Sequence, residues 1–302
     1  MPDSIFNQNV TGWAVDPNSA SEVSAFQSSI AYYYGGVGVN LVRPLYQVPT
    51  NQATVSVGVK SGCNNFLSNT GTSAPIPSWA VVGNSGDSII GVYSTNADYE
   101  YWDATQNSSS SWSACWGGAT TNLSTFSGVF PSNYGETATG ISNMATEITW
   151  ADIVSGSINH AIGITLGSEY CNGSVYPANR TDCGSHPGDP SEGTWFRFAP
   201  GTTCSPSQCS TPFATMVFNA ILQYGMVAID SGGANQLEAE QVGDWALEGN
   251  AACNGSNCGP ALTGLTGTNP WEASTGGPTG PASYQVVASL PWSSLQVVDP
   301  PQ

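Results

Sequence analysis

The sequence has very little positive charge. Of its 302 residues only four are Lys or Arg, against 21 Asp and Glu, and the formal net charge is -17. Charged residues make up 8% of the chain, so Ser, Thr, Asn and Gly must cover most of the surface. A chain with this charge repels nucleic acid and anionic membranes, and we expect neither as a partner.

The sequence also lacks long hydrophobic runs and the common catalytic motifs. No stretch predicts a transmembrane helix, and the polar N-terminus shows no signal peptide, so we expect the numbering to start on a mature chain. No G-x-S-x-G elbow, no H-E-x-x-H and no phosphate-binding glycine loop is present. With two histidines and no elbow, a Ser–His–Asp hydrolase is poorly supported.

Cysteine is present in an even number, eight, which favours disulfides. Cys204–Cys209 and Cys253–Cys258 are close pairs, Cys171–Cys183 would close a central loop, and Cys63 and Cys115 would pair by elimination. The spacing does not fit a metal site, and the sequence alone leaves the pairing open. Disulfides predict a secreted protein, and scarce lysine with a pI near 4.1 indicates an acidic setting or mere compositional drift.

Many short alternating segments between Gly, Asn and Ser turns predict a mainly β fold, a β-sandwich or jelly roll with a few peripheral helices. We expect one domain over 1–302, with an N-terminal helix over about 19–34 and a Gly/Pro-rich C-terminal extension packed on it. A capping box at Ser19 and Glu22 would begin that helix, and a second one at Thr149 and Asp152 a short turn. Further helices are expected from Pro212 to Tyr224 and over 237–247, and strands over 52–60, 80–82, 88–92, 99–104, 111–116, 158–166, 194–198 and 226–230.

The stretch 157–198 holds both histidines and two of the four bases. His160 lies in an otherwise apolar row of an expected strand, and a cysteine-bounded loop after it carries Arg180 and Asp182. We expect these three side chains to meet, with His160 as an acid/base or substrate-binding group. The alternative is a hydrogen-bonded core histidine and an ion pair that fixes the loop. Glu192 is a weaker carboxylate candidate.

A second candidate stretch is YEYWD, in which Glu100 and Trp102 share one face of an expected strand. A carboxylate beside a Trp suits a sugar-binding groove, because the ring stacks on a pyranose and apolar surroundings raise the carboxyl pKa. Trp116 follows on a neighbouring strand. The alternative is that Trp102 is a core residue and Glu100 a hydrogen-bonded edge residue.

Short segments along the whole chain resemble a family of secreted, largely uncharacterised proteins of actinobacteria such as streptomycetes. The chain departs from that family because it has almost no Lys or Arg outside the matching positions. It also departs in several cysteine pairs and at Asp103 and Glu147. The resemblance implies secretion and a concanavalin-like or jelly-roll sandwich, and it implies no activity. The matching segments are DSIFNQNV, DPNSA, YEYW, WSACWGG, SGSINHAI, YPANRTD, EGTWFRF, QYGMVAID, TGTNPW and SYQVVASLPWSSLQ, and the matching polar positions are Glu100, His160, Arg180, Asp182, Glu192 and Arg197.

The leading hypothesis from the sequence is a secreted, acid-adapted glycoside hydrolase that cleaves a neutral polysaccharide with paired carboxylates. Glu100 would be one catalytic carboxylate, and Asp182 or Glu192 the other. Trp102 and Trp116 would stack on the sugar. His160 and Arg180 would orient the catalytic pair.

Two other function classes remain open. In a polysaccharide lyase, Arg180 would neutralise a uronate and His160 or Tyr224 would act as the base, although the global negative charge argues against such a substrate. In a non-catalytic glycan-binding or cell-surface protein, the ten tryptophans would suffice. We expect a monomer with no cofactor and no metal. An ordered Ca²⁺ in a loop is compatible with the sequence, but no motif predicts it.

Overall fold

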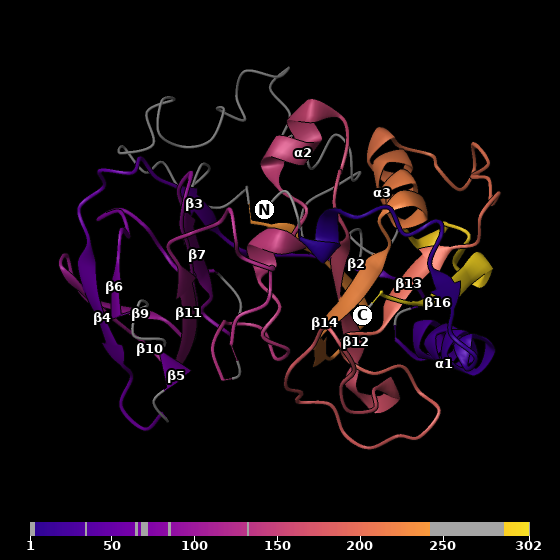
Figure 1. Ribbon diagram of the computed structural model, residues 1–302, viewed down its shortest axis with the longest axis horizontal. Helices are drawn as coiled ribbons and strands as arrows, with labels where there is room; N and C mark the ends of the chain where they lie inside the picture. The colour runs from indigo at the N-terminus through magenta and orange to yellow at the C-terminus, as the bar shows by residue number, and fades with distance from the viewer. Residues whose placement is uncertain are drawn as a thin grey trace.

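The computed structural model describes residues 4–33, 35–63, 66–67, 72–83, 86–131, 133–241 and 287–301. It is mainly β, with 30% of residues in strands and 19% in helices, so the predicted fold class is confirmed. The strands form three sheets, and Figure 1 shows the two smaller ones at one end of an elongated molecule and the largest at the other.

The largest sheet has seven strands and is mixed. β12 pairs with β14 and β15 pairs with β2 in parallel, and its other pairs are antiparallel. Its strands come from both ends of the chain, so the sheet joins the N-terminal and C-terminal segments. In spatial order they are β1 (Ala14–Val15), β16 (Leu295–Asp299), β13 (Trp195–Phe198), β14 (Met226–Gly232), β12 (Ile162–Gly167), β15 (Gln236–Glu240) and β2 (Gly38–Arg43).

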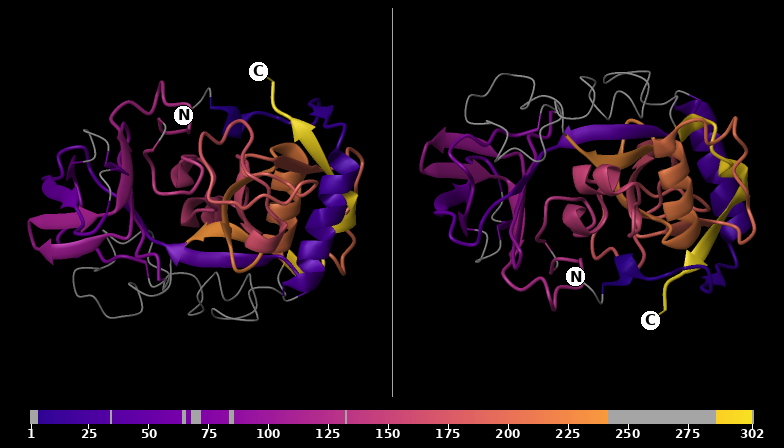
Figure 2. Two further views of the ribbon diagram at one scale, coloured as in Figure 1. Left: turned by 90° about the horizontal axis from the view of Figure 1, so that it is seen from below. Right: turned by 90° about the horizontal axis from the view of Figure 1, so that it is seen from above.

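One face of this sheet is apolar and is covered by helices. Alternate residues such as Ile162 and Ile164 of β12 pack with Phe26 of α1 (Ser19–Tyr32) and Phe213 and Val217 of α3 (Pro212–Gln223). Figure 2 shows both helices along this side of the sheet. Other helical elements in the described part of the chain include α2 (Trp150–Ser155) and the short 3-10 turns η1 (Ile5–Asn7), η3 (Asn143–Ala145), η4 (Ser168–Tyr170) and η6 (Trp292–Ser294).

The two smaller sheets pack face to face and form a small sandwich. Val57 and Trp112 of one sheet share a core with Ile90, Val92 and Tyr101 of the other. The four-stranded sheet consists of β6 (Ser73–Ala74), β4 (Val55–Val59), β10 (Ser111–Ala114) and β9 (Thr105–Ser108). The five-stranded sheet consists of β3 (Leu45–Gln47), β7 (Ile90–Tyr93), β8 (Asp98–Trp102), β11 (Trp116–Thr120) and β5 (Phe66–Leu67).

The second face of the seven-stranded sheet is partly polar and looks toward this sandwich. On β15, Leu237 and Ala239 enter the helix-covered core, so the intervening Glu238 points to the opposite face. A β-bulge between β12 and β14 places Asp230 opposite Thr165. The segment around η3 runs between the sandwich and this polar face in Figures 1 and 2, and the candidate site forms there.

Several local predictions are confirmed. Thr149 and Asp152 form a reciprocal capping box on α2, Gly156 ends that helix in the left-handed conformation, and Thr211 caps α3. The disulfides Cys63–Cys115, Cys171–Cys183 and Cys204–Cys209 are present. Cys253 and Cys258, like most of the Gly/Pro-rich C-terminal stretch, lie outside the described residues.

Other local predictions are wrong. Residues 237–240 are strand β15 rather than helix, and 242–247 lie outside the described residues. Asn18, not Ser19, occupies the N-cap position of α1, without a capping hydrogen bond from its side chain, and the Ser19 hydroxyl accepts a hydrogen bond from Val297 N–H at 2.8 Å. Residues 80–82 are not a strand, and β12 begins at Ile162, so His160 precedes it.

None of the described helices is both long and apolar enough to cross a bilayer.

Substituting Gly225 tests the packing between α3 and the sheet. Gly225 and Gly201 both have positive φ, +79° and +86°, but only at Gly225 would a Cβ overlap the Trp195 indole nitrogen and lie 2.7 Å from the Phe196 carbonyl oxygen. We expect Gly201→Ala to lower the free energy of unfolding by about 1 kcal/mol. Gly225→Ala should cost roughly 2–4 kcal/mol more. Urea unfolding measures both, and equal losses would contradict the steric argument.

Candidate functional site

Three carboxyl groups, from Asp182, Glu192 and Asp230, lie together near the C-terminal end of β14, the central strand of the seven-stranded sheet. Asp182 and Glu192 have carboxylate oxygens within 4.8 Å of each other, and Asp182 N–H donates to Glu192 Oε2 at 3.3 Å. Ser231 joins Asp182 to Asp230. Its hydroxyl donates to Asp182 Oδ1 at 2.7 Å and its N–H to Asp230 Oδ1 at 2.9 Å. The structure thus places Asp182 and Glu192, two alternative candidates from the sequence, next to each other and adds Asp230.

Backbone pairing holds this group in place. Glu192 N–H donates to Gly173 O at 2.9 Å, and Val175 N–H donates to Glu192 O at 2.8 Å, so the two ends of the loop between η4 and β13 pair with each other. The Cys171–Cys183 disulfide closes the same loop next to Asp182. Asp182 therefore lies on an exposed loop that is held by this backbone pairing and by the disulfide. A side chain that contacts substrate needs such a well-supported position.

The three carboxyls differ in their environments. Glu192 is fully buried, and burial, reinforced by Asp182 and Asp230, raises its pKa to about 9 although Thr181 donates to it. Asp230 has a quarter of its side chain exposed. Burial and the negative charges of Asp182 and Glu238 raise its pKa to about 7, against the opposing effect of Arg43. At acidic pH, Glu192 and Asp230 thus carry protons next to the exposed Asp182.

Arg180 links this loop to the aromatic pair of the five-stranded sheet. Its guanidinium carbon lies 4.5 Å from the centre of the Trp116 ring, and the Trp116 and Trp102 rings are 6.1 Å apart. The structure therefore brings together three of the predicted substrate-binding residues. Trp102 also donates its indole N–H to Asp87 Oδ1 at 3.3 Å.

The guanidinium of Arg180 is mostly occupied by the backbone. Nε donates to Ala138 O at 3.0 Å, Nη1 to Tyr134 O at 2.7 Å, and Nη2 to Gly135 O at 3.1 Å and to Thr137 O. Four of its five N–H groups are thus used, and burial lowers its pKa to about 10. Among the described residues no ion pair joins Arg180 to Asp182, so Arg180 fixes the loop by other contacts.

Glu100 points into the protein. It is 1% exposed, and its Oε1 accepts from Ser142 Oγ at 2.7 Å and from Met144 N at 3.0 Å. The same Ser142 hydroxyl lies 3.0 Å from Asp98 Oδ2. Burial raises the pKa of both carboxyls, and the neighbouring Glu100 raises that of Asp98 further. Glu100 does have a carboxyl partner, Asp98, but this pair lies inside the contact between β8 and η3.

His160 and Tyr224 have other partners. His160 Nε2 lies 3.3 Å from Asp152 Oδ2, and Nδ1 lies 2.8 Å from Ala161 O. Tyr224 is the C-terminal cap of α3, and its backbone carbonyl accepts from the Trp195 indole N–H at 3.0 Å. The predicted alternative, a hydrogen-bonded structural histidine, describes what the structure shows for His160.

Sequence reasoning missed the cluster around Arg43. This buried guanidinium contacts Glu136 Oε1 at 2.7 Å, Glu238 Oε2 at 3.2 Å and Asp230 Oδ2 at 3.3 Å. It also donates to Asn143 Oδ1. The scarcity of bases was a signal, because an arginine buried in so acidic a chain is well placed to contact carboxylates. Nothing in the sequence indicates that Arg43 is this arginine or which carboxylates it meets.

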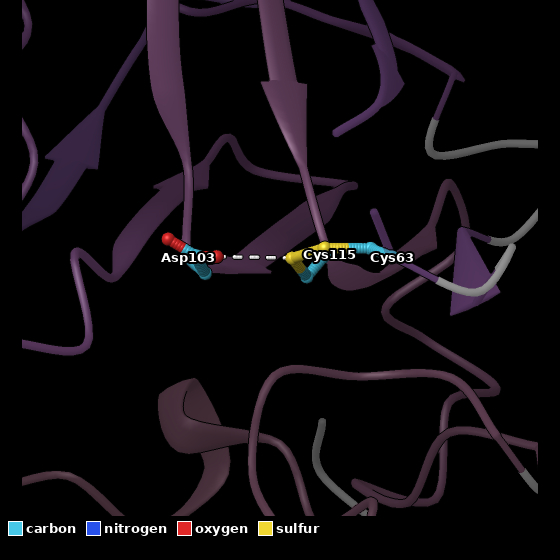
Figure 3. Close-up of side chains that lie close together, drawn as sticks. All are labelled: Cys63, Asp103 and Cys115. Carbon is cyan, nitrogen blue, oxygen red and sulfur yellow. Dashed lines mark hydrogen bonds between the residues drawn. A yellow bond between two sulfur atoms is a disulfide. The ribbon is translucent and has the colours of Figure 1, made fainter. Parts of the chain in front are cut away.

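Two groups of side chains have ligand atoms close enough to hold a metal ion among the described residues. One is Cys63, Asp103 and Cys115, drawn in Figure 3, and the other is Asp182, Cys183 and Glu192. In both groups the cysteines form disulfides, so neither offers a thiolate. Asp103 Oδ2 lies 3.0 Å from Cys115 Sγ, and its Oδ1 pairs with Lys60 at 2.5 Å. The first group is therefore better explained as a disulfide with an adjacent ion pair.

Comparisons of the chain with protein-family models, with curated proteins and with solved structures find no match. The resemblance to secreted actinobacterial proteins stays a prediction, and the interpretation of the site depends on its own geometry.

Replacing His160 should cost stability in a pH-dependent way. Burial disfavours the charged ring, but Asp152 outweighs this and the His160 pKa is raised. The pKa of Asp152 is lowered, because its hydrogen bonds from His160 and Thr149 outweigh burial. The contribution of the pair is present from about pH 4 to 6 and is lost as the pH rises through the His160 pKa or falls through that of Asp152. We expect His160→Gln to lower the free energy of unfolding by about 1–2 kcal/mol at pH 5 and by less at pH 8.

A double-mutant cycle with Asp152→Asn isolates the pair from the helix cap that Asp152 also provides. The coupling energy between the two side chains should be measurable at pH 5 and vanish at pH 9. A coupling that stays constant across this range would contradict the ion pair.

Proposed function

We propose that the chain is a secreted glycoside hydrolase that cleaves a neutral polysaccharide at acidic pH, with Asp182 and Asp230 as its catalytic carboxyls. The observation that carries the proposal is this pair: one exposed carboxyl and one partly exposed carboxyl of pKa about 7, joined through Ser231. Glycoside hydrolysis requires a pair of carboxyls, one of which donates a proton, and Asp230 with its pKa of about 7 can fill that role.

The roles follow from the two environments. Protonated Asp230 would donate its proton to the glycosidic oxygen as the bond from the anomeric carbon to that oxygen breaks. The Asp182 carboxylate would stabilise the positive anomeric carbon or attack it. Water then forms the new bond to that carbon, displacing Asp182 where it has attacked, and gives its proton to Asp230, so that both carboxyls return to their starting states.

Glu192 supports Asp182 rather than touching substrate. It is fully buried, its pKa of about 9 keeps it neutral at acidic pH, and it accepts the Asp182 N–H. A neutral carboxyl can donate a hydrogen bond to the adjacent Asp182 side chain, which holds that group in one orientation. We therefore assign Glu192, a catalytic candidate from the sequence, as a positioning residue.

The substrate class is inferred from the surroundings of the site. Trp102 and Trp116 are half-buried and form an aromatic border beside the Arg180 loop, and aromatic rings pack well on the apolar faces of sugars. A net charge of -17 favours a neutral substrate over an acidic one. The three disulfides are typical of an oxidising compartment, which supports secretion.

The lyase hypothesis has less support. Arg180 donates four of its N–H groups to backbone carbonyls, and His160 is paired with Asp152. Neither side chain is arranged to bind a uronate or to remove its proton. If no polysaccharide is cleaved, non-catalytic glycan binding becomes the better explanation of the site.

Activity should depend on Asp182 and Asp230 and not on a nearby acid. We would incubate the protein with a panel of neutral and uronic-acid polysaccharides at pH 3–6 and record reducing ends and ultraviolet absorbance. Asp182→Asn and Asp230→Asn should each lower kcat by about 10²–10⁴-fold, whereas Asp189→Asn, with an acid of the same loop region, should leave it unchanged. Full activity of Asp182→Asn would contradict the proposal, and an absorbing product would indicate a lyase.

The pH profile of kcat/KM should fall above pH 7. The acid limb reports the group that must be ionised and the alkaline limb the group that must be protonated, which here is Asp230 with its pKa of about 7. Activity that rises between pH 7 and 9 would exclude Asp230 as the proton donor.

A further inference from the structure

A second group of buried acids surrounds Glu147, away from the surface. Glu147 is 0% exposed, and neither of its carboxylate oxygens has a hydrogen-bond partner among the described residues. Its backbone is firmly held, because Glu147 N–H donates to Asn143 O at 2.7 Å and Ile148 pairs with β15 on both sides through Glu238 O and Glu240 N. The side chain therefore cannot turn to solvent without breaking this pairing.

The charges that face Glu147 are mostly negative. Glu136 approaches from the segment before η3, Glu238 and Glu240 from β15, and the Tyr93 hydroxyl from β7. Arg43 of β2 is the cation among these neighbours, and it is already in contact with Glu136, Glu238 and Asp230.

The other three bases of the chain have partners elsewhere. Lys60 pairs with Asp103, Arg180 binds the carbonyls of residues 134–138, and Arg197 binds Val10 O and Gln296. The acids around Arg43 therefore exceed its charge. An ionised carboxylate with no donor in such a place is strongly disfavoured, whereas a protonated one is tolerated.

We propose that Glu147 is a proton-binding site that makes this fold depend on acidic pH: the protein keeps its conformation with a proton on Glu147, and ionisation loosens the contact of residues 143–149 with the sheets around them. The ligand of this site is the proton. Glu147 is not one of the carboxyls assigned to catalysis, and the inference stands whether or not the chain is a hydrolase.

The direction of the pH dependence follows from proton linkage. Burial, with added repulsion from Glu240, Glu136 and Glu238, raises the pKa of Glu147 well above its ordinary value, and Arg43 offsets this only in part. The folded state therefore binds a proton that the unfolded chain releases above about pH 4. The contribution of Glu147 to stability is complete below that pH and is lost as the pH rises toward its folded-state pKa.

Other buried acids act in the same direction. Asp98 shares the Ser142 hydroxyl with Glu100, and Glu136 lies against Arg43 with its Oε2 unpartnered among the described residues. Burial raises the pKa of each. Wild type should therefore lose stability as the pH rises. Its unfolding equilibrium constant should increase about tenfold per pH unit for every proton that the folded state retains and the unfolded chain releases.

The test compares wild type with Glu147→Gln in denaturant unfolding from pH 3 to 8. The amide has the same shape and no charge, so we expect equal or lower stability than wild type at pH 3–4 and higher stability at pH 7–8. The free energy of unfolding of the variant should change less steeply with pH than that of wild type, by the amount that corresponds to one bound proton. Glu169→Gln, an exposed acid of η4, is the matched control and should run parallel to wild type.

A proton count gives a second readout. When the protein unfolds at pH 6 in weak buffer, a pH indicator should report about one proton fewer released by Glu147→Gln than by wild type. A wild type whose stability rises from pH 4 to 8, or a Glu147→Gln that loses the same stability at every pH, would overturn the proposal. If Glu147→Gln does not fold, denaturant unfolding of wild type and of Asp98→Asn over the same pH range decides. Wild type should lose stability as the pH rises, and Asp98→Asn should lose it less steeply by one proton.

Discussion

One buried guanidinium, that of Arg43, holds the centre of this protein together. It ends β2 and contacts carboxylates from the segment before η3, from β14 and from β15, so one side chain joins the seven-stranded sheet to the layer that faces the sandwich. Removing one partner of a buried ion pair typically costs about 3–5 kcal/mol, because the other charge stays buried and unpaired. Removing Arg43 would leave several buried carboxyls without the positive charge that they now contact.

The same excess of acid explains both proposals. Each carboxyl that is buried without enough positive charge nearby prefers to carry a proton. At the edge of the cluster, where Asp230 is partly exposed, this preference gives a group that can donate its proton to a substrate. In the interior, at Glu147, it links folding to pH. An acid-dependent fold and acid-dependent chemistry would thus have one physical cause.

Local structure was predictable where short-range interactions decide it. The capping box of Thr149 and Asp152 and the Thr211–Pro212 start of α3 were confirmed, because a cap depends only on residues within one turn. Residues 237–240 were wrongly predicted as helical, since Leu, Glu and Ala favour helices in isolation. In the protein they pair with β12 and β2 on either side, and this pairing overrides the local preference.

The sequence by itself determined the chemical inventory: an excess of acids, four bases, disulfide-forming cysteines and a mainly β pattern. It also identified the cysteine-bounded loop that carries Arg180 and Asp182, but it wrongly expected His160 to meet them, because His160 pairs with Asp152. Only the tertiary structure decided which acids are buried and what each one meets. Asp182 contacts Ser231, Glu100 contacts Ser142, and Arg43 contacts Glu238 across long stretches of chain. Such contacts arise when sheets pack, and no local pattern of residues specifies them.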